Sequence, residues 1–176
     1  MNTVAFTGYR PEKMPFFEDE ENIQYIQFRK QLKRVIERLV ERGYVNFISG
    51  VAQGFDTWAA EDVLDLKKKN KSITLECAIP FPQQADGWKE LEQKRRKRII
   101  DHATSHITTG NYPSKANFLK RNRYMVDKAD VVVCAYDGQS GGTAYTVDYA
   151  IKHDKIVIQI NPSTLKVDII SNKWFD

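Results

Sequence analysis

The sequence has few of the residues that build metal centres, disulfide frameworks and membrane spans. Its 176 residues include two cysteines and three histidines, too few for a structural zinc site. Cys77 and Cys134 both lie in apolar, strand-like runs, which favours buried free thiols in a reducing compartment. No apolar stretch reaches transmembrane length, and Met1-Asn2 leads directly into a predicted strand and not into a signal peptide. We therefore expect a cytoplasmic protein with no metal site and no membrane partner.

Repeats and linkers of low complexity are missing as well. The length is typical of one domain, so we expect a single domain over residues 1–176. With 41% hydrophobic and 28% charged residues, the composition is that of a globular protein. The net charge is +4, and much of it lies in two basic runs at residues 67–69 and 94–98. Such runs are usually solvated helix faces, so nucleic acid is not an expected partner.

Strand-like and helix-like patterns alternate along the whole chain. Short apolar runs predict strands at residues 4–6, 45–49, 73–79, 105–109, 130–136 and 155–160. The run at 130–136 is the strongest, because an unbroken apolar segment suits a central parallel strand that is covered on both faces. This alternation predicts an α/β protein: a single Rossmann-like, doubly wound domain with a mostly parallel sheet of about six strands and helices on both faces.

Two of the predicted helices carry specific expectations. In the helix that begins near residue 55, Asp56 is well placed as the N-cap, with a ligand contact as the alternative. The helix over roughly residues 86–103 is strongly charged. Apolar residues at helical spacing still predict an inward face on it, formed by Trp88, Leu91, Ile99 and Ile100.

Three polar turns follow predicted strands, at residues 7–10, 49–54 and 138–143. The carboxyl ends of parallel strands meet at one edge of a sheet, where ligands bind near the switch in strand order. Gly50 and Gly54 would let the backbone approach a ligand that a Cβ would exclude. The helix that begins directly after them presents free N–H groups and the positive end of its dipole to an anion. Together the turns predict a site for a phosphate-bearing nucleotide or nucleotide-sugar.

The candidate ligand-binding residues come from these turns and from one later helix. They are Thr7, Gly8, Tyr9, Arg10, Ser49, Gly50, Gln53, Gly54, Asp56, Arg121, Asp137, Ser140, Gly141, Gly142 and Thr143. Arg121 and Arg123 lie on opposite sides of the predicted helix, so at most one of them faces the crevice. Arg10 is either an anion contact or a surface turn residue, and Asp137 either accepts ribose hydroxyls or caps its turn. No catalytic residue is assigned, since the histidines show no spacing with a nucleophile.

Three motifs follow one another along the chain. They are Gly8-Tyr9-Arg10 after the first strand, Ser49-Gly50-x-Ala52-x-Gly54-x-Asp56-x-x-Ala59-Ala60, and the stretch from Asp130 to Gly141-Gly142-Thr143. Their order and spacing resemble the SLOG superfamily, which includes the YpsA-like proteins, the cytokinin-activating Lonely guy phosphoribohydrolases and DNA-processing protein A. The YpsA-like branch is the most similar, because the length, the Gly-Tyr-Arg opening, Trp58 and Pro80-Phe81 all fall in order.

The resemblance implies a Rossmann-like fold whose glycine turns hold a nucleotide-type ligand, either ADP-ribose-like or another NAD derivative. Some SLOG domains sense such signals in bacterial and phage conflict systems. We therefore expect a sensor or sequestering protein that binds a small nucleotide or nucleotide-sugar and requires no cofactor. A phosphoribohydrolase, or another enzyme that cleaves an N-glycosidic bond, is the first alternative. A DNA-binding module like DNA-processing protein A is the second, and a homo-oligomer is left open.

The hydrolase alternative depends on one motif. The phosphoribohydrolases carry an arginine before a methionine, and then Pro-Gly-Gly-x-Gly-Thr-x-x-Glu. This sequence keeps the arginine and methionine at 121–125 and the Gly-Gly-Thr, but it has Ser140 for the proline and Thr146 for the catalytic glutamate. Cleavage develops oxocarbenium character that a carboxylate stabilises. Thr146 cannot carry negative charge at neutral pH, although it can still donate a hydrogen bond to phosphate or ribose. Asp148 is expected to face elsewhere on the helix, so binding without hydrolysis is predicted.

Overall fold

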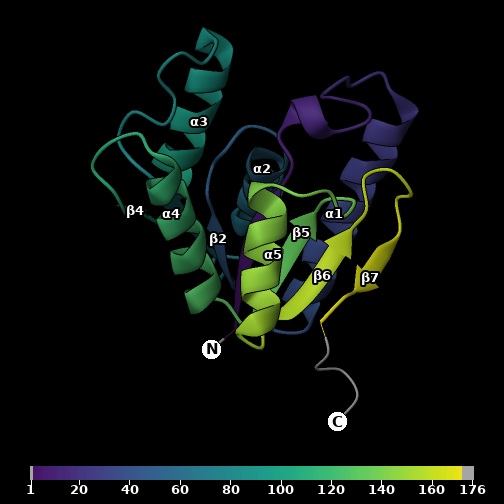
Figure 1. Ribbon diagram of the computed structural model, residues 1–176. Helices are drawn as coiled ribbons and strands as arrows, with labels where there is room; N and C mark the ends of the chain where they lie inside the picture. The colour runs from purple at the N-terminus through teal and green to yellow at the C-terminus, as the bar shows by residue number, and fades with distance from the viewer. Residues whose placement is uncertain (1, 172–176) are drawn as a thin grey trace.

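The computed structural model describes residues 2–171 of the chain (Figure 1). Within these residues the elements are β1 (Thr3–Gly8), α1 (Ile23–Glu41), β2 (Asn46–Ser49), α2 (Phe55–Lys69), β3 (Thr74–Ile79), α3 (Glu90–His102), β4 (Ser105–Thr108), α4 (Lys115–Lys128), β5 (Val131–Ala135), α5 (Gly142–Lys152), β6 (Ile156–Ile160) and β7 (Val167–Ile169). A short 3-10 helix, η1 (Pro11–Lys13), follows β1. Strand and helix alternate up to β6, as the apolar patterns predict.

The strands form one sheet in the order β4-β3-β2-β1-β5-β6-β7. Neighbouring strands from β4 to β6 are parallel, and β7 pairs antiparallel with β6. Because β1 lies between β2 and β5, the direction in which the chain adds strands reverses beside β1. This is the topological switch point of a doubly wound sheet, and ligands in such folds bind outside the carboxyl ends of the strands at this point.

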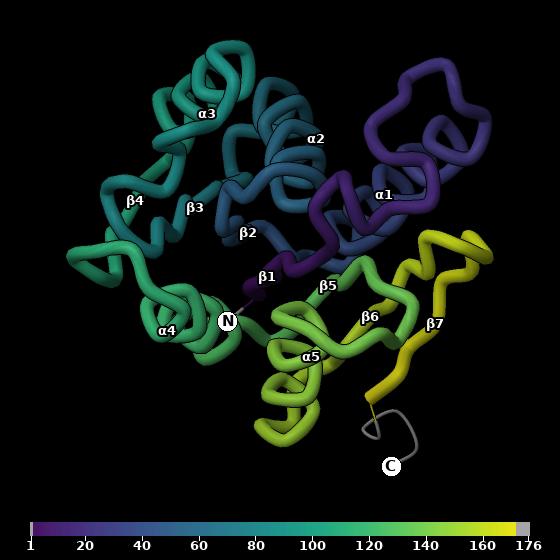
Figure 2. The backbone as a smooth tube through the Cα atoms, turned by 45° about the horizontal axis from the view of Figure 1, so that its top comes forward, coloured from purple at the N-terminus to yellow at the C-terminus, as the bar shows by residue number. Residues whose placement is uncertain are grey.

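Helices cover both faces of the sheet (Figure 2). The core under α1, α2 and α3 is the larger one and holds the large aromatic side chains Phe6, Phe28, Phe47, Phe55 and Trp58. The core under α4 and α5 is built from smaller side chains, among them Ala5, Val132 and Val147. Alternate residues of β1 and β5 point into the two cores, which explains why these central strands read as unbroken apolar runs.

Two features differ from the prediction. β7 adds a seventh strand at the sheet edge, and its three exposed residues lack the apolar run that marks the other strands. Leu91 was predicted to face inward, but its side chain is 76% exposed. On α3, Arg95 binds Glu61 of α2 and Ile99 is buried, and both lie further along the helix than Leu91. The first turn of α3 is therefore left in solvent.

The two cysteines match the prediction of buried free thiols. Cys77 and Cys134 are buried and free of disulfides, and burial raises the pKa of the Cys77 thiol to about 12. None of the helices within residues 2–171 is long and apolar enough to cross a membrane. The same residues bring together no group of three His, Cys, Asp or Glu side chains that could hold a metal ion.

Candidate functional site

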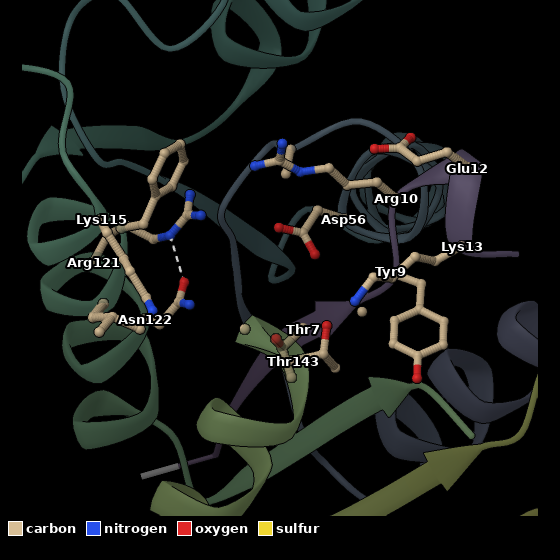
Figure 3. Close-up of a pocket in the computed structure, with 15 residues that line it drawn as sticks. Thr7, Tyr9, Arg10, Glu12, Lys13, Asp56, Lys115, Arg121, Asn122 and Thr143 are labelled. Carbon is tan, nitrogen blue, oxygen red and sulfur yellow. Dashed lines mark hydrogen bonds between the residues drawn. The ribbon is translucent and has the colours of Figure 1, made fainter. Parts of the chain in front are cut away.

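A crevice of about 360 Å³ opens at the carboxyl end of β1, at the switch point of the sheet (Figure 3). Its walls come from the turn after β1, from the N-terminal ends of α2 and α5, and from the first half of α4. The lining residues are Thr7, Gly8, Tyr9, Arg10, Glu12, Lys13, Ala52, Asp56, Lys115, Phe118, Leu119, Arg121, Asn122, Gly142 and Thr143. Two helix N-termini and several polar side chains thus meet at the position that the fold predicts for a ligand.

The loop that joins β2 to α2 is held in one shape by its own side chains. The Ser49 hydroxyl accepts a hydrogen bond from the Val51 N–H (3.1 Å) and donates one to the Asp56 carbonyl (2.9 Å). The Thr57 hydroxyl donates to the Ala52 carbonyl (2.7 Å). These bonds hold the buried Val51 at φ 45°, a left-handed conformation that is costly for a β-branched residue. This strained loop places Ala52 and Asp56 on the crevice wall.

Arg121 is a buried arginine that joins α4 to this loop. Its Nη1 donates to the carbonyls of Gly50 (2.6 Å) and Ala78 (3.1 Å), and its Nε donates to Asn122 Oδ1 (2.8 Å). A Cβ on Gly50 would lie 2.5 Å from Nη1, so glycine is what allows the guanidinium to approach. Burial lowers the pKa of Arg121 to about 10, and the charge of Asp56 opposes this shift. The space beside Gly50 is therefore filled by the Arg121 side chain, whereas the glycine pattern predicted a ligand there.

Two polar residues outside the predicted set support the same carbonyl. Gln84, buried in the turn after β3, donates from Nε2 to the Gly50 carbonyl (3.0 Å). Arg96 of α3 donates from Nε to Gln84 Oε1 (3.1 Å). A signal for Gln84 did exist, because it closely follows the Pro80-Phe81-Pro82 turn at the carboxyl end of a predicted strand. Gln84 and Arg121 thus donate to the same carbonyl and together fix the position of Gly50.

Asp56 is the buried carboxylate of the crevice. It is the second residue of α2, only 5% of its surface is exposed, and it lines the cavity. The prediction that it caps α2 is wrong: the N-cap is Gly54 at φ 84°, with no side-chain cap, so the N-cap lies two residues earlier than predicted. Burial raises the pKa of Asp56 to about 6, although Arg121, the Ala52 N–H and Arg10 all favour its charged form.

Cations outnumber carboxylates on the crevice wall. The side chains of Arg10, Lys13, Lys115 and Arg121 face only two carboxylates, those of Glu12 and Asp56. The Arg10 guanidinium lies over the Phe118 ring at 5.6 Å, and Lys13 Nζ lies 5.4 Å from the Tyr9 ring. With the positive dipole ends of α2 and α5 added, the crevice attracts anions.

The predicted residues divide into two groups. Those on the crevice wall are Thr7, Gly8, Tyr9, Arg10, Asp56, Arg121, Gly142 and Thr143; those outside the lining are Ser49, Gly50, Gln53, Gly54, Asp137, Ser140 and Gly141. Members of the second group shape the first. Asp137 accepts a hydrogen bond from the Tyr9 hydroxyl (2.6 Å), and burial together with this bond raises the pKa of Tyr9 to about 12. A Cβ on Gly54 would lie 2.8 Å from the Tyr9 carbonyl, so this glycine lets the two loops pack.

The crevice-facing side of α4 was not predicted beyond Arg121. Lys115, Phe118, Leu119 and Asn122 recur three and four positions apart and line the cavity. From the sequence, Phe118 and Leu119 are assigned to an apolar core face with Met125 and Val126, and no pattern separates Lys115 and Asn122 from a solvated face. Arg123 lies on another side of α4 and is exposed, as predicted.

Thr146 does not point into the crevice. It is buried in α5, and its hydroxyl donates to the Gly142 carbonyl (2.9 Å) one turn earlier. The expectation that Thr146 could donate to phosphate or ribose is therefore wrong, because the donor already has a backbone acceptor within its own helix. Asp148, also on α5, is exposed and outside the crevice lining, as predicted.

The doubly wound, mostly parallel sheet defines a Rossmann-like α/β protein, and its cation-lined crevice lies at the switch point of that sheet. The family model of YpsA, described as the YspA SLOG family, matches residues 4–167. The chain belongs to this family, which confirms the resemblance carried by its motifs.

Known relatives agree with this assignment. The chain is 31% identical over 161 residues to UPF0398 proteins of Bacillus thuringiensis strain Al Hakam and Bacillus cereus strain Q1, covering 89% of this chain and 86% of each relative. Its fold is similar to DNA processing protein A from Streptococcus pneumoniae (TM-score 0.62, 19% identity, 90% of this chain and 50% of that chain). It is also similar to that protein from Helicobacter pylori (TM-score 0.60, 21% identity, 89% of this chain and 64% of that chain). At 19% and 21% identity, the similarity to these two structures shows the fold alone.

Proposed function

We propose that the crevice binds a phosphate-bearing nucleotide or nucleotide-sugar of the ADP-ribose kind, and that the protein acts as a sensor or sequestering protein. The observation that carries this proposal is the convergence of Arg10, Lys13 and Lys115 with the N-terminus of α5 at the switch point of the sheet. Helix N-termini and arginines are the protein groups best suited to phosphate. A volume of about 360 Å³ is within the usual range for small-molecule sites.

The proposal gives each part of the wall a role. The phosphate lies against the first N–H groups of α5, at Gly142 and Thr143, where the helix dipole favours negative charge. Arg10 grips the phosphate oxygens, and the guanidinium is already oriented by the Phe118 ring beneath it. The Thr7 and Thr143 side chains, which also line the cavity, offer small hydroxyl donors to the same anion.

Binding is favoured over cleavage of the ribosyl bond. A hydrolase needs a carboxylate beside the sugar carbon that becomes positively charged. In the resembling phosphoribohydrolases the motif glutamate falls at Thr146, which here is buried and hydrogen-bonded to the Gly142 carbonyl. A bound nucleotide should therefore be recovered unchanged.

Binding of single-stranded DNA is a weaker proposal for this chain. DNA processing protein A from Helicobacter pylori has a single-stranded DNA binding mode, and this chain spans 64% of that protein. The basic runs of this chain lie on α2 and α3, and several of their charges are already paired, with Lys68 on Asp65, Lys94 on Glu90 and Lys97 on Asp101. Paired lysines of this kind describe a solvated helix surface better than a track for phosphates.

The test is calorimetric titration with ADP-ribose, AMP and inorganic pyrophosphate. For any ligand that the wild type binds, Arg10→Ala should reduce the binding free energy by about 1.5–3 kcal/mol, the usual range for hydrogen bonds to a charged group. The matched control is Arg38→Ala, which removes an exposed arginine from the last turn of α1 and should leave affinity unchanged. Chromatography after incubation should return the nucleotide intact. If Arg10→Ala binds as well as Arg38→Ala, Arg10 is a surface residue, and if the wild type binds none of the three ligands the proposal fails.

A further inference from the structure

Asp56 is unexpected in a crevice that otherwise attracts anions. Its carboxylate is almost fully buried on the crevice wall, where it would repel a phosphate. Figure 3 shows it pointing into the space between Arg10 on one side and Thr7 and Thr143 on the other. Arg121 is the buried cation whose charge acts on Asp56. It donates its hydrogen bonds to the carbonyls of Gly50 and Ala78 and to Asn122. Asp56 is therefore influenced by Arg121 through space, without a direct ion pair.

The other carboxylates near the crevice and elsewhere on α2 have partners or are in solvent. Asp137 accepts hydrogen bonds from the Tyr9 hydroxyl and the Gln139 side chain. Asp62, further along α2, forms an ion pair with Arg29 at 3.2 Å. Glu12 lies at the crevice rim and is exposed. Asp56 differs from all three, because it is buried and faces the cavity.

The hydrogen-bonding capacity of Asp56 is largely unused. Within residues 2–171 no side chain donates a hydrogen bond to its carboxylate, and the Ala52 N–H is the backbone group that favours its charged form, whereas an ionised carboxylate can accept about four hydrogen bonds. A buried carboxylate with free lone pairs favours a ligand group that donates hydrogen bonds, and a pair of hydroxyls fills both oxygens. The phosphate groups of a nucleotide are mostly ionised at neutral pH and offer few such donors, so the group that Asp56 accepts from must be another part of the ligand.

We infer that Asp56 recognises the vicinal hydroxyls of a sugar attached to the phosphate, so that the crevice selects ribose phosphates over deoxyribose phosphates. This inference rests on the proposed function, because it needs the phosphate to lie at the Arg10 end of the crevice. It adds the substrate class: a ribosyl phosphate in which the diol lies on the α2 side and the phosphate on the α5 side. The Asp56 carboxylate then makes the crevice select ribose over deoxyribose, while its negative charge weakens the binding of anions in general.

The experiment compares ribose 5-phosphate with 2-deoxyribose 5-phosphate, which carry the same charge, and uses inorganic pyrophosphate as a ligand without a sugar. The wild type should bind ribose 5-phosphate about tenfold more tightly than the deoxy sugar, since a buried carboxylate loses a donor in the second complex. Asp56→Asn and Asp56→Ala should reduce this ratio to about twofold or less and should bind pyrophosphate several-fold more tightly than the wild type. Pyrophosphate binding also serves as a folding control, because a variant that binds pyrophosphate still has a folded crevice.

The matched control is Asp65→Asn, which removes an exposed carboxylate of the same helix outside the crevice lining and should keep the tenfold preference. A wild type that binds both sugars equally overturns the inference, and so does an Asp56→Asn variant that keeps the wild-type preference. Those results leave the proposed function standing as long as pyrophosphate or ADP-ribose binds. A wild type that binds no phosphate ligand at all refutes the proposed function, and this inference with it.

Discussion

Two carboxylates on α2, the buried Asp56 and the half-buried Asp62, show how the same residue type acquires different roles. Burial raises the pKa of each to about 6. Asp62 is paired with Arg29, whose guanidinium lies over the rings of Tyr25 and Trp58. Asp56 faces the crevice instead, with Arg121 acting on it only through space. Asp62 belongs to the packing of α1 against α2. Asp56 is held in a position that folding alone does not favour.

Replacing Asp56 with asparagine should therefore stabilise the protein at neutral pH. The pKa of Asp56 rises from 3.8 to about 6 on folding, so the native state holds this proton more strongly than the unfolded chain does. The stability that this proton contributes is complete below pH 3.8, and it is lost as pH rises through about 6. At pH 7.5 the loss is on the order of 3 kcal/mol, from 1.36 kcal/mol per pKa unit. Urea unfolding of Asp56→Asn should give a higher free energy of unfolding than the wild type at pH 7.5, and a smaller difference at pH 5.

The control for this measurement is Asp65→Asn, which removes an exposed carboxylate of the same helix that pairs with Lys68 and should change stability by less than about 0.5 kcal/mol at either pH. An Asp56→Asn variant that is less stable than the wild type at pH 7.5 would show that the charge of Asp56 supports Arg121 more than burial opposes it.

At the scale of elements, the glycine turns illustrate what a sequence pattern can and cannot predict. Apolar runs followed by glycine located the ends of β1 and β2 and the starts of α2 and α5, because these signals are local. The pattern could not distinguish Gly50, which adjoins Arg121, from Gly142, which lines the crevice. Arg121 approaches Gly50 from 71 positions along the chain, and no local signal encodes that contact. For the same reason Lys13 and the lining face of α4 were missed, whereas Arg10 and Thr143, which lie in the turns themselves, were predicted.

Alanine at these two glycines should have opposite effects. In Gly50→Ala the new Cβ would lie 2.5 Å from Arg121 Nη1 and 2.8 Å from Asp56 Oδ2, so the buried arginine must move and its carbonyl bonds weaken. We expect a loss of about 2–3 kcal/mol of stability, in the range for overpacking a core. Gly142→Ala meets no atom within 4 Å at the first residue of α5, and it should be neutral or slightly stabilising. Thermal melts of the two variants decide this, and equal melting temperatures would contradict the role given to Gly50.

At the scale of the whole molecule, the two cores are joined by shared strands. β1 sends Val4 and Phe6 to the core under α1–α3, and Ala5 to the core under α4 and α5. β5 does the same with alternate residues of its apolar run. Losing either helical layer would expose one face of the central strands, so neither core can persist in its native form without the other.

The chain should therefore unfold in a single cooperative transition. We expect differential scanning calorimetry to give one peak whose calorimetric and van't Hoff enthalpies agree. A ligand that binds the crevice should raise the melting temperature of the whole peak, because the crevice combines α2 from one layer with α4 and α5 from the other. At 100 times its dissociation constant, a ligand adds about 2.7 kcal/mol, or roughly 5–10 °C for a domain of this size. Two separate peaks, with only one of them moved by the ligand, would mean that the helical layers unfold independently and that the crevice belongs to just one of them.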